Sequence, residues 1–528
     1  MAGLLVYLRF LIRRERLSSS LWIILSLVFT AGLVYVYPSL FEDQVNMRDM
    51  LDLMTSPAML ALMGPAYDTE SLTVMMLYSG EISIFVMVSL AVMNIFFVVR
   101  HTRNDEELGR LEMISSLPVG RVTTATATFL LAVLVNLLIA LPTVLAIVII
   151  QVEGTTLMGA VAYTLAIFSV GLFFAAVALL TAQLFSTARG ASGGALMVLG
   201  LAYIIRAYGD MTGSLLSATP PIGLGLQSFA FLSDRLWPSL VNLALALLIA
   251  GLALLVCARR DLGQGVLPAR PGRSQASTAL LSSLGLTWQL TRNLVMVWSL
   301  VLFLTAALYG SVIGSITDFV STNPLYLQIV AGGIDAASTL TDGYTALLFL
   351  IMTLLSVIPV INITNHVLSE EKHGRLEALL SRSVDRRRLL LDSILIAFLV
   401  SVCAQLICAF GMYVAAAPSG LVDLQTLLMA SLVYLPAIWV FIGIGVMLTG
   451  LAPRLSFLIW VYYGYAFVIV YIGRMFALPK WLPRTVPFGN VPQIPVDDFS
   501  LLPLVVLSVI AVALCAIGLW GFKQRDIQ

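Results

Sequence analysis

Residues 101–121 read HTRNDEELGRLEMISSLPVGR, and a related segment, HVLSEEKHGRLEALLSRSVDR, follows at residues 366–386. Nine positions carry the same residue in both segments, including the run Gly-Arg-Leu-Glu, and each matched pair lies 265 residues apart. Weaker matches extend outward: Pro57 and Pro324 are 267 residues apart, and Pro221 and Pro487 are 266 apart. A register that drifts by only two residues over such distances indicates a tandem duplication.

The composition around these segments is that of a membrane protein. Of the 528 residues, 60% are hydrophobic and 11% are charged, whereas soluble domains carry about 25% charged residues. Apolar runs long enough to cross a hydrocarbon core of about 30 Å recur along the chain. We therefore predict an all-α polytopic membrane protein with about 12 transmembrane helices and no large external domain. The predicted spans are 20–37, 73–99, 122–150, 156–184, 190–209 and 238–257, then 294–314, 344–364, 389–416, 425–449, 455–474 and 501–521.

Each repeat holds an even number of spans, so the two six-helix halves are expected to be parallel, related by an axis along the membrane normal. We place the first half at 1–258, a cytoplasmic linker at 259–278 and the second half at 279–528. Leucines at positions 4, 8 and 11 recur at helical spacing away from arginines at 9, 13 and 16. This pattern predicts an amphipathic helix on the membrane surface. The alternative is that it is only the start of the first span.

Basic residues predict the orientation. If the N-terminus is cytoplasmic, most of the 29 Lys and Arg residues fall in cytoplasmic segments, as the positive-inside rule requires. We therefore expect a multi-pass protein of the plasma membrane with both termini in the cytoplasm.

The duplicated segments, called here the GRLE loops (residues 101–121 and 366–386), carry charges at helical spacing. In the first, acidic residues alternate with Arg103 and Arg110 before Pro118 and Gly120 interrupt the helix. We expect the second span to continue beyond the membrane, kink, form a short charged helix and turn back. A solvated cap would need only basic residues, and that alternative stays open. Glu, Gly, Arg and Glu at fixed spacing in both copies favour docking to a protein partner through charged pairs.

The loops, the two six-span halves and the starting amphipathic helices resemble the permeases of ATP-binding-cassette (ABC) exporters, specifically the fused two-half polyketide-antibiotic exporter permeases. The resemblance implies that each GRLE loop is a coupling helix seated in a groove of a nucleotide-binding subunit. The docking residues that it implies are Glu106, Gly109, Arg110, Glu112, Glu371, Gly374, Arg375 and Glu377. Because Glu107 is matched by Lys372 and Pro118 by Ser383, the two docking sites need not be equivalent.

The chain carries no ATPase motif of its own. A phosphate-binding P-loop requires G-x-x-x-x-G-K-[ST], yet none of the three lysines, Lys372, Lys480 and Lys523, has glycine before it or Ser or Thr after it. We therefore expect no catalytic or metal site here. ATP and Mg are expected on a separate ATPase partner, present in two copies to match the two loops.

In exporters of the kind that this chain resembles, spans 2 and 5 of each half line the path, which maps to spans 2, 5, 8 and 11 here. Methionine and aromatic side chains there suit a large apolar ligand. The alternative is ordinary packing between helices and against lipid. The candidate path residues are Phe85, Met93, Asn94, Phe97, Tyr203, Phe349, Trp460, Tyr463 and Phe467. The expected function is ATP-driven export of hydrophobic compounds such as antibiotics, drugs or lipid-like molecules, with membrane lipid but no nucleic acid as a further partner.

An ion-coupled secondary transporter with two parallel six-helix halves is the main alternative. Such transporters carry an ionisable residue deep in a span, and Glu81 is the deepest acid in this chain. It could bind a cation or pair with Arg206, although a solvated position at the outer mouth is the simpler interpretation. A third possibility is a scaffold or sensor that uses the loops only to recruit a partner.

Overall fold

The chain divides into two compact units, Met1–Gly272 and Arg273–Gln528, and each is described by itself. The boundary lies within the predicted linker 259–278. The computed structural model describes residues 3–40, 51, 54–55, 57–65, 73–116, 119–267, 275, 277–322, 340–372, 374–376, 385–420, 422–471, 473, 479 and 481–525. Glu377, Pro118, Ser383 and Pro324, which the sequence analysis used, lie outside these residues.

Twelve helices in the described part of the chain are long and apolar enough to cross a membrane. No strand occurs among those residues. Every predicted span coincides with one of these helices, so the all-α polytopic fold is confirmed. Hydropathy locates the spans well because an unpaired backbone amide in hydrocarbon is costly, which leaves the α-helix as the solution for each apolar run.

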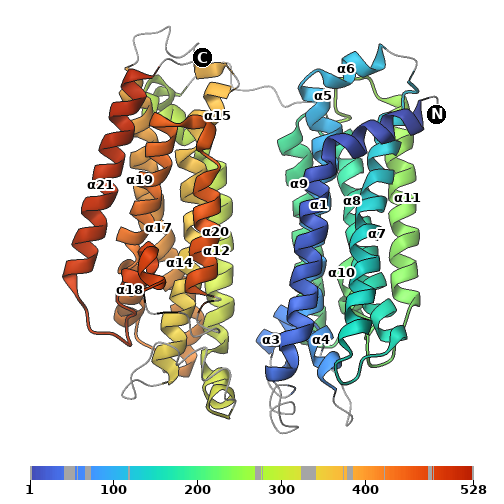
Figure 1. Cartoon of the computed structure of the whole chain (residues 1–528), viewed down its shortest axis with the longest axis horizontal. Helices are drawn as coiled ribbons and strands as arrows, with labels where there is room; N and C mark the ends of the chain where they lie inside the picture. The colour runs from blue at the N-terminus through green and yellow to red at the C-terminus, as the bar shows by residue number, and fades with distance from the viewer. Residues whose placement is uncertain are drawn as a thin grey trace. The chain divides into compact units, whose positions relative to one another are not determined.

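The first unit contains six long helices and four short ones (Figure 1). The short helices follow the first long helix (α3), join the second to the third (α5 and α6), and precede the last (α10). Their bounds are α1 Leu4–Val36, α3 Pro57–Met63, α4 Val74–Val99, α5 Asp105–Glu107, α6 Arg110–Ser115, α7 Thr123–Ile150, α8 Leu157–Leu184, α9 Ala188–Thr212, α10 Pro221–Leu226 and α11 Trp237–Arg259.

The second unit repeats this order with a divided fourth span. Pro436 lies in the first turn of α19, where its ring and missing N–H separate that helix from α18. The bounds are α12 Ser283–Thr322, α14 Leu340–Thr364, α15 His366–Lys372, α17 Arg386–Ala416, α18 Leu424–Leu432, α19 Leu435–Leu451, α20 Leu458–Val470 and α21 Leu501–Gln524.

Helix packing repeats along with the sequence. In the first unit, α8 packs against α11 and α4, and α1 packs against α7. In the second unit, the corresponding contacts are those of α19 with α21 and α14, and of α12 with α17. Both units are thus built around their fourth span, whose apolar segment is 78% buried in α8 and 67% buried across α18 and α19. This agreement is what a tandem duplication predicts.

The predicted amphipathic helix and the first span form one continuous helix, α1, of 33 residues. Figure 1 shows its first turns running across the end of the unit before the helix bends along the other helices. Leu11 is buried while Leu5 and Leu17 are 71% and 79% exposed, so one face of these turns packs on the unit and the other is free.

Two expectations for charged residues near the span ends are wrong. Glu81 is only 6% exposed, so it is not a solvated residue at a mouth. Arg206 does not pair with it, because Asp210 lies one helical turn along α9 and binds the Arg206 guanidinium at 3.0 Å. Arg206 also donates to the carbonyl of Leu60, at 3.2 Å, and to that of Ala61. It therefore fixes α3 on α9.

Matched glycines test the repeated packing. A Cβ on Gly223 would lie 1.7 Å from the carbonyl oxygen of Ser217, and one on Gly489 would lie 2.0 Å from that of Pro483. We expect Gly223→Ala and Gly489→Ala each to lower the free energy of unfolding by about 1–3 kcal/mol, the usual cost of overpacking, seen as a lower thermal midpoint in detergent. Gly200→Ala in α9, where nothing lies within 4 Å, is the control and should be neutral or stabilising. Equal midpoints for all three variants would contradict the repeated close contact.

Candidate functional site

The GRLE loops have the same turn in both units. In the first, α4 runs into a π-helical turn at Arg100–Asn104, followed by α5 and α6. Gly109 joins α5 to α6 with a φ of 69°, a left-handed conformation that glycine adopts without strain. Gly374 has the same φ. The N–H of each glycine donates to the carbonyl of the glutamate three residues earlier, at 3.0 and 2.9 Å. The kinked, charged extension of span 2 is therefore present, and the conserved turn explains the repeated glycine.

The arginine after each glycine lies at the surface and is held on one side by an acid. Arg110 binds Asp105 at 2.9 Å, and Arg375 binds Glu370 at 2.8 Å. The two arginine side chains are 49% and 55% exposed, while the Asp105 side chain is 1% exposed and that of Glu370 is 13%. A guanidinium has five N–H donors, so each arginine is oriented by its acid and still has donors that face outward. Glu112 is exposed in the same loop.

The first glutamate of each pattern points the other way. The two oxygens of Glu106 each accept from Arg260 at 2.8 Å, and one accepts from the Gly263 N–H at 2.6 Å. Glu371 likewise binds Arg525. Both carboxylates are used inside their own unit, so any part that they have in docking is indirect. Burial would raise the pKa of the Glu106 carboxyl, but the bonds from Arg260 and Gly263 outweigh it and hold that pKa below its ordinary value.

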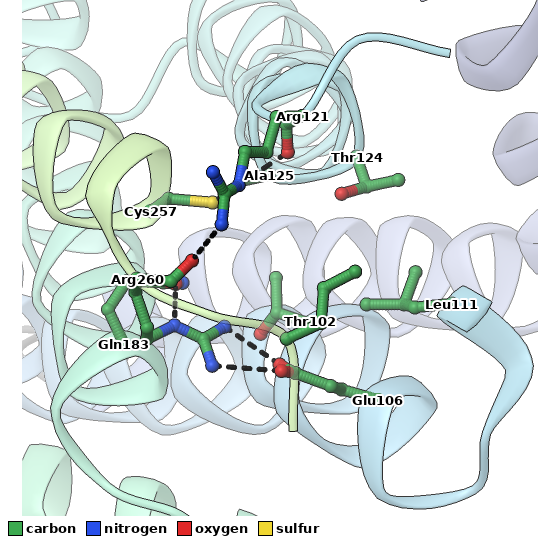
Figure 2. Close-up of a pocket in the computed structure, with 10 residues that line it drawn as sticks. Thr102, Glu106, Leu111, Arg121, Thr124, Ala125, Gln183, Cys257 and Arg260 are labelled. Carbon is green, nitrogen blue, oxygen red and sulfur yellow. Dashed lines mark hydrogen bonds and ion pairs between the residues drawn. The ribbon is translucent and has the colours of Figure 1, made fainter. Parts of the chain in front are cut away.

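Figure 2 shows how Arg260 joins three elements. Its guanidinium reaches Glu106 in the loop and Gln183 at the end of α8, and its carbonyl accepts from Arg121, just before α7, at 2.9 Å. The cavity between these residues has a volume of about 30 Å³, enough for a water molecule but not for a drug. Sequence reasoning used Arg260 only as a basic residue for orientation. Its match with Arg525 at the repeat spacing is the signal that could have found it.

The first loop has contacts that the second lacks among the described residues. Arg103, 1% exposed, donates to the Ala182 carbonyl at 2.9 Å and binds Glu106 at 3.2 Å. A buried leucine, Leu368, occupies the matching position. Arg14 of α1 also binds Asp105, at 2.6 and 3.0 Å. The first loop is therefore tied to the N-terminal helix as well as to α8.

Four of the candidate path residues have packing roles. Asn94 exchanges hydrogen bonds with Asn136 at 2.7 and 3.0 Å, and the Phe97 ring packs edge-on against His101 at 4.9 Å. Met93 and Phe349 are 4% and 0% exposed. These four side chains face the interior and do not form a wall, because sequence shows which residues share a helix but not which face is covered.

The other candidates reach the surface of their unit. Phe85, Trp460 and Phe467 are 44%, 38% and 36% exposed. Tyr203 and Tyr463 are partly covered, and their hydroxyls donate to the carbonyls of Leu62 and Leu354 at 3.1 and 3.0 Å. On α4, Phe85 belongs to a single exposed line on an otherwise buried helix; the line consists of Phe85, Ser89, Phe96 and Arg100.

Comparison with known proteins now places the chain. A family model described as "Multidrug efflux system permease Rv1217c, C-terminal domain" matches residues 280–523. Over 541 aligned residues the chain is 32% identical to the multidrug efflux system permease protein Rv1217c of Mycobacterium tuberculosis (strain ATCC 25618 / H37Rv), covering 100% of this chain and 95% of that protein. This chain belongs to the Rv1217c permease family. Membership confirms the resemblance to exporter permeases that the GRLE loops indicated.

The pairing of Asp105 leads to a stability prediction for this member of the family. Asp105→Asn removes the charge that Arg14 and Arg110 share, so we expect a loss of about 1–3 kcal/mol, the range for a buried hydrogen-bonded group. Amide hydrogen exchange should become faster at residues 100–116, and the thermal midpoint should fall. Glu107→Gln, on an exposed neighbour, is the control. If the two variants exchange alike, Asp105 does not hold the loop.

Proposed function

We propose that this chain is the membrane-spanning permease subunit of an ATP-driven ABC exporter that moves hydrophobic compounds, such as drugs, antibiotics or lipid-like molecules, out of the cell. ATP and Mg would bind a separate nucleotide-binding subunit, present in two copies. Support for the transported class comes from the relative, which is a multidrug efflux permease. Support for an external motor comes from the missing P-loop and the duplicated loops.

One observation carries the proposal: each unit presents the same glycine turn followed by an exposed arginine that an acid holds in place. An arginine oriented in this way is suited to bind a carboxylate of a partner with its remaining donors. Two such positions fit two copies of one ATPase. Closure of the ATPase pair on ATP would shift both loops, and α4, which continues into the first loop, would carry the motion into the membrane.

The docking assignment predicts the effect of charge reversal. In Arg110→Glu with Arg375→Glu, the new carboxylates repel Asp105 and Glu370 and any acidic partner group, and losing such an interfacial charge costs about 2–5 kcal/mol. We expect the ATPase retained on the purified chain to fall at least about tenfold, as measured by quantitative mass spectrometry, and drug-stimulated ATP hydrolysis to disappear. Arg189→Glu with Arg454→Glu is the matched control, because these exposed arginines are also 265 residues apart but lie outside the loops.

Full ATPase retention in the loop variant would contradict the docking assignment. Absence of any ATPase from the gently extracted wild-type chain would contradict the ATP-driven mechanism. Glu81, buried and with one oxygen lacking a hydrogen-bond partner in the described structure, favours the ion-coupled alternative. That alternative requires efflux to stop with a protonophore while cellular ATP is maintained.

The exposed line on α4 predicts where substrate contacts lie. Phe85 and Phe96, 44% and 52% exposed, are three helical turns apart on one face. We expect Phe85→Ala with Phe96→Ala to change the efflux of large apolar compounds by about 10-fold or more for some of them, at roughly 1–3 kcal/mol for a lost aromatic contact, without reducing ATPase retention. Phe410→Ala, at an exposed position of α17, should have no effect. An unchanged profile across a panel of compounds would remove this face from the path.

A further inference from the structure

An arginine caps the last membrane helix of each unit. Arg260 follows α11 directly, and Arg525 follows α21. Each has its guanidinium on the first glutamate of the GRLE pattern and its carbonyl accepting from the arginine at the start of the third span. The donor is Arg121, at 2.9 Å, in the first unit and Arg386, at 3.5 Å, in the second. We call each arginine with its two partners a clasp: Glu106–Arg260–Arg121 and Glu371–Arg525–Arg386.

All three members of one clasp are matched by the other at the repeat spacing of 265 residues. The neighbourhood, by contrast, has changed. Arg103 beside the first clasp is matched by Leu368, and Gln183, which bonds Arg260, is matched by Leu448. The clasp has therefore stayed in both copies while the polar groups around it were replaced.

The clasp suits the transfer of motion more than the supply of stability. Replacing a buried ion pair by apolar residues is often neutral or stabilising, so burial alone gives no reason to keep it twice. The two parallel bonds of a carboxylate to a guanidinium fix both the distance and the angle between their backbones. Arg260, 8% exposed in its side chain, makes such a pair, so the first loop cannot move without displacing the end of α11.

We propose that Arg260 and Arg525 are positioning residues that couple each GRLE loop to the last span of its own half. Motion of the loop reaches α11 or α21 through the ion pair, and these helices pack along the buried fourth span, α8 or α19. This inference rests on the proposed function, because it takes the loops to be moved by an ATPase.

The two clasps differ in a way that sharpens the test. Without Arg260, Glu106 still has Arg103 at 3.2 Å and the Gly263 N–H at 2.6 Å. Without Arg525, Glu371 keeps no other basic partner among the residues that the structure describes. Loss of Arg525 should therefore release its loop more completely than loss of Arg260.

The experiment compares Arg260→Gln and Arg525→Gln with Arg259→Gln and Lys523→Gln, which remove the same charge from exposed neighbours. Each chain is reconstituted in liposomes with its ATPase, and both ATPase retention and drug transported per ATP hydrolysed are measured. We expect normal retention, a fall of at least about fivefold in transport per ATP for Arg525→Gln, at the low end of typical coupling between sites, and a smaller fall for Arg260→Gln. The exchange Glu371→Arg with Arg525→Glu should recover much of the loss.

Transport per ATP equal to the controls would overturn the proposal. So would loss of the ATPase with an unchanged ratio, because the arginine would then only shape the docking surface. If Arg525→Gln does not fold, Arg525→Lys keeps the charge without the paired geometry, and the same fall is expected.

A second measurement separates this inference from the proposed function. In the isolated chain, amide hydrogen exchange at residues 366–376 should be faster in Arg525→Gln than in Lys523→Gln. Equal exchange overturns the clasp whether or not an ATPase is found. Faster exchange in a chain that never retains an ATPase supports the clasp and removes only the proposed motor.

Discussion

Buried carboxylates at the ends of membrane helices must be paired, and this requirement determines how the GRLE loops are built. Glu106 is 8% exposed and Asp105 is 1% exposed. Leaving such a charge without its partner costs about 3–5 kcal/mol. The loop therefore takes the one position in which Arg260, Arg103 and Arg14 reach these two acids. The turn at Gly109, the path of α1 and the end of α11 are all tied to it.

Duplication preserved some of these contacts and altered others. The glycine turn, the surface arginine with its acid, and the pair with the arginine after the last span occur in both units. The buried Arg103 and the bond from Arg14 to Asp105 belong to the first. A chain with two fused halves can diverge in this way, because each half is no longer constrained to match an identical copy. The expectation that the two loops differ came from positions 107 and 118, but the larger difference lies at Arg103.

Sequence predicted the spans, the repeat and the kinked loop, because these depend on hydropathy, spacing and backbone chemistry. It failed where the answer depends on which helix face is covered. Glu106 was expected to face a partner and faces inward, Phe349 was expected on a path and is fully buried, and Glu81 was expected in solvent and is nearly inaccessible. A helix buried on most sides, such as α4, has no polar face to show its direction, so composition carries little of that information.

The exposed line of α4 and the first loop are parts of one element. The line begins at Phe85 and reaches Arg100, where the π-helical turn starts and the chain continues into α5. A π-turn widens the helix locally and shifts the residues that follow it around the axis. The extra residue lets Asp105 and Glu106 face α1 and α11 while Phe85 and Phe96 stay on the uncovered side of the span. Any force on the loop consequently acts on the helix that carries the exposed aromatic side chains, and its direction is set by the acids that hold the loop in place.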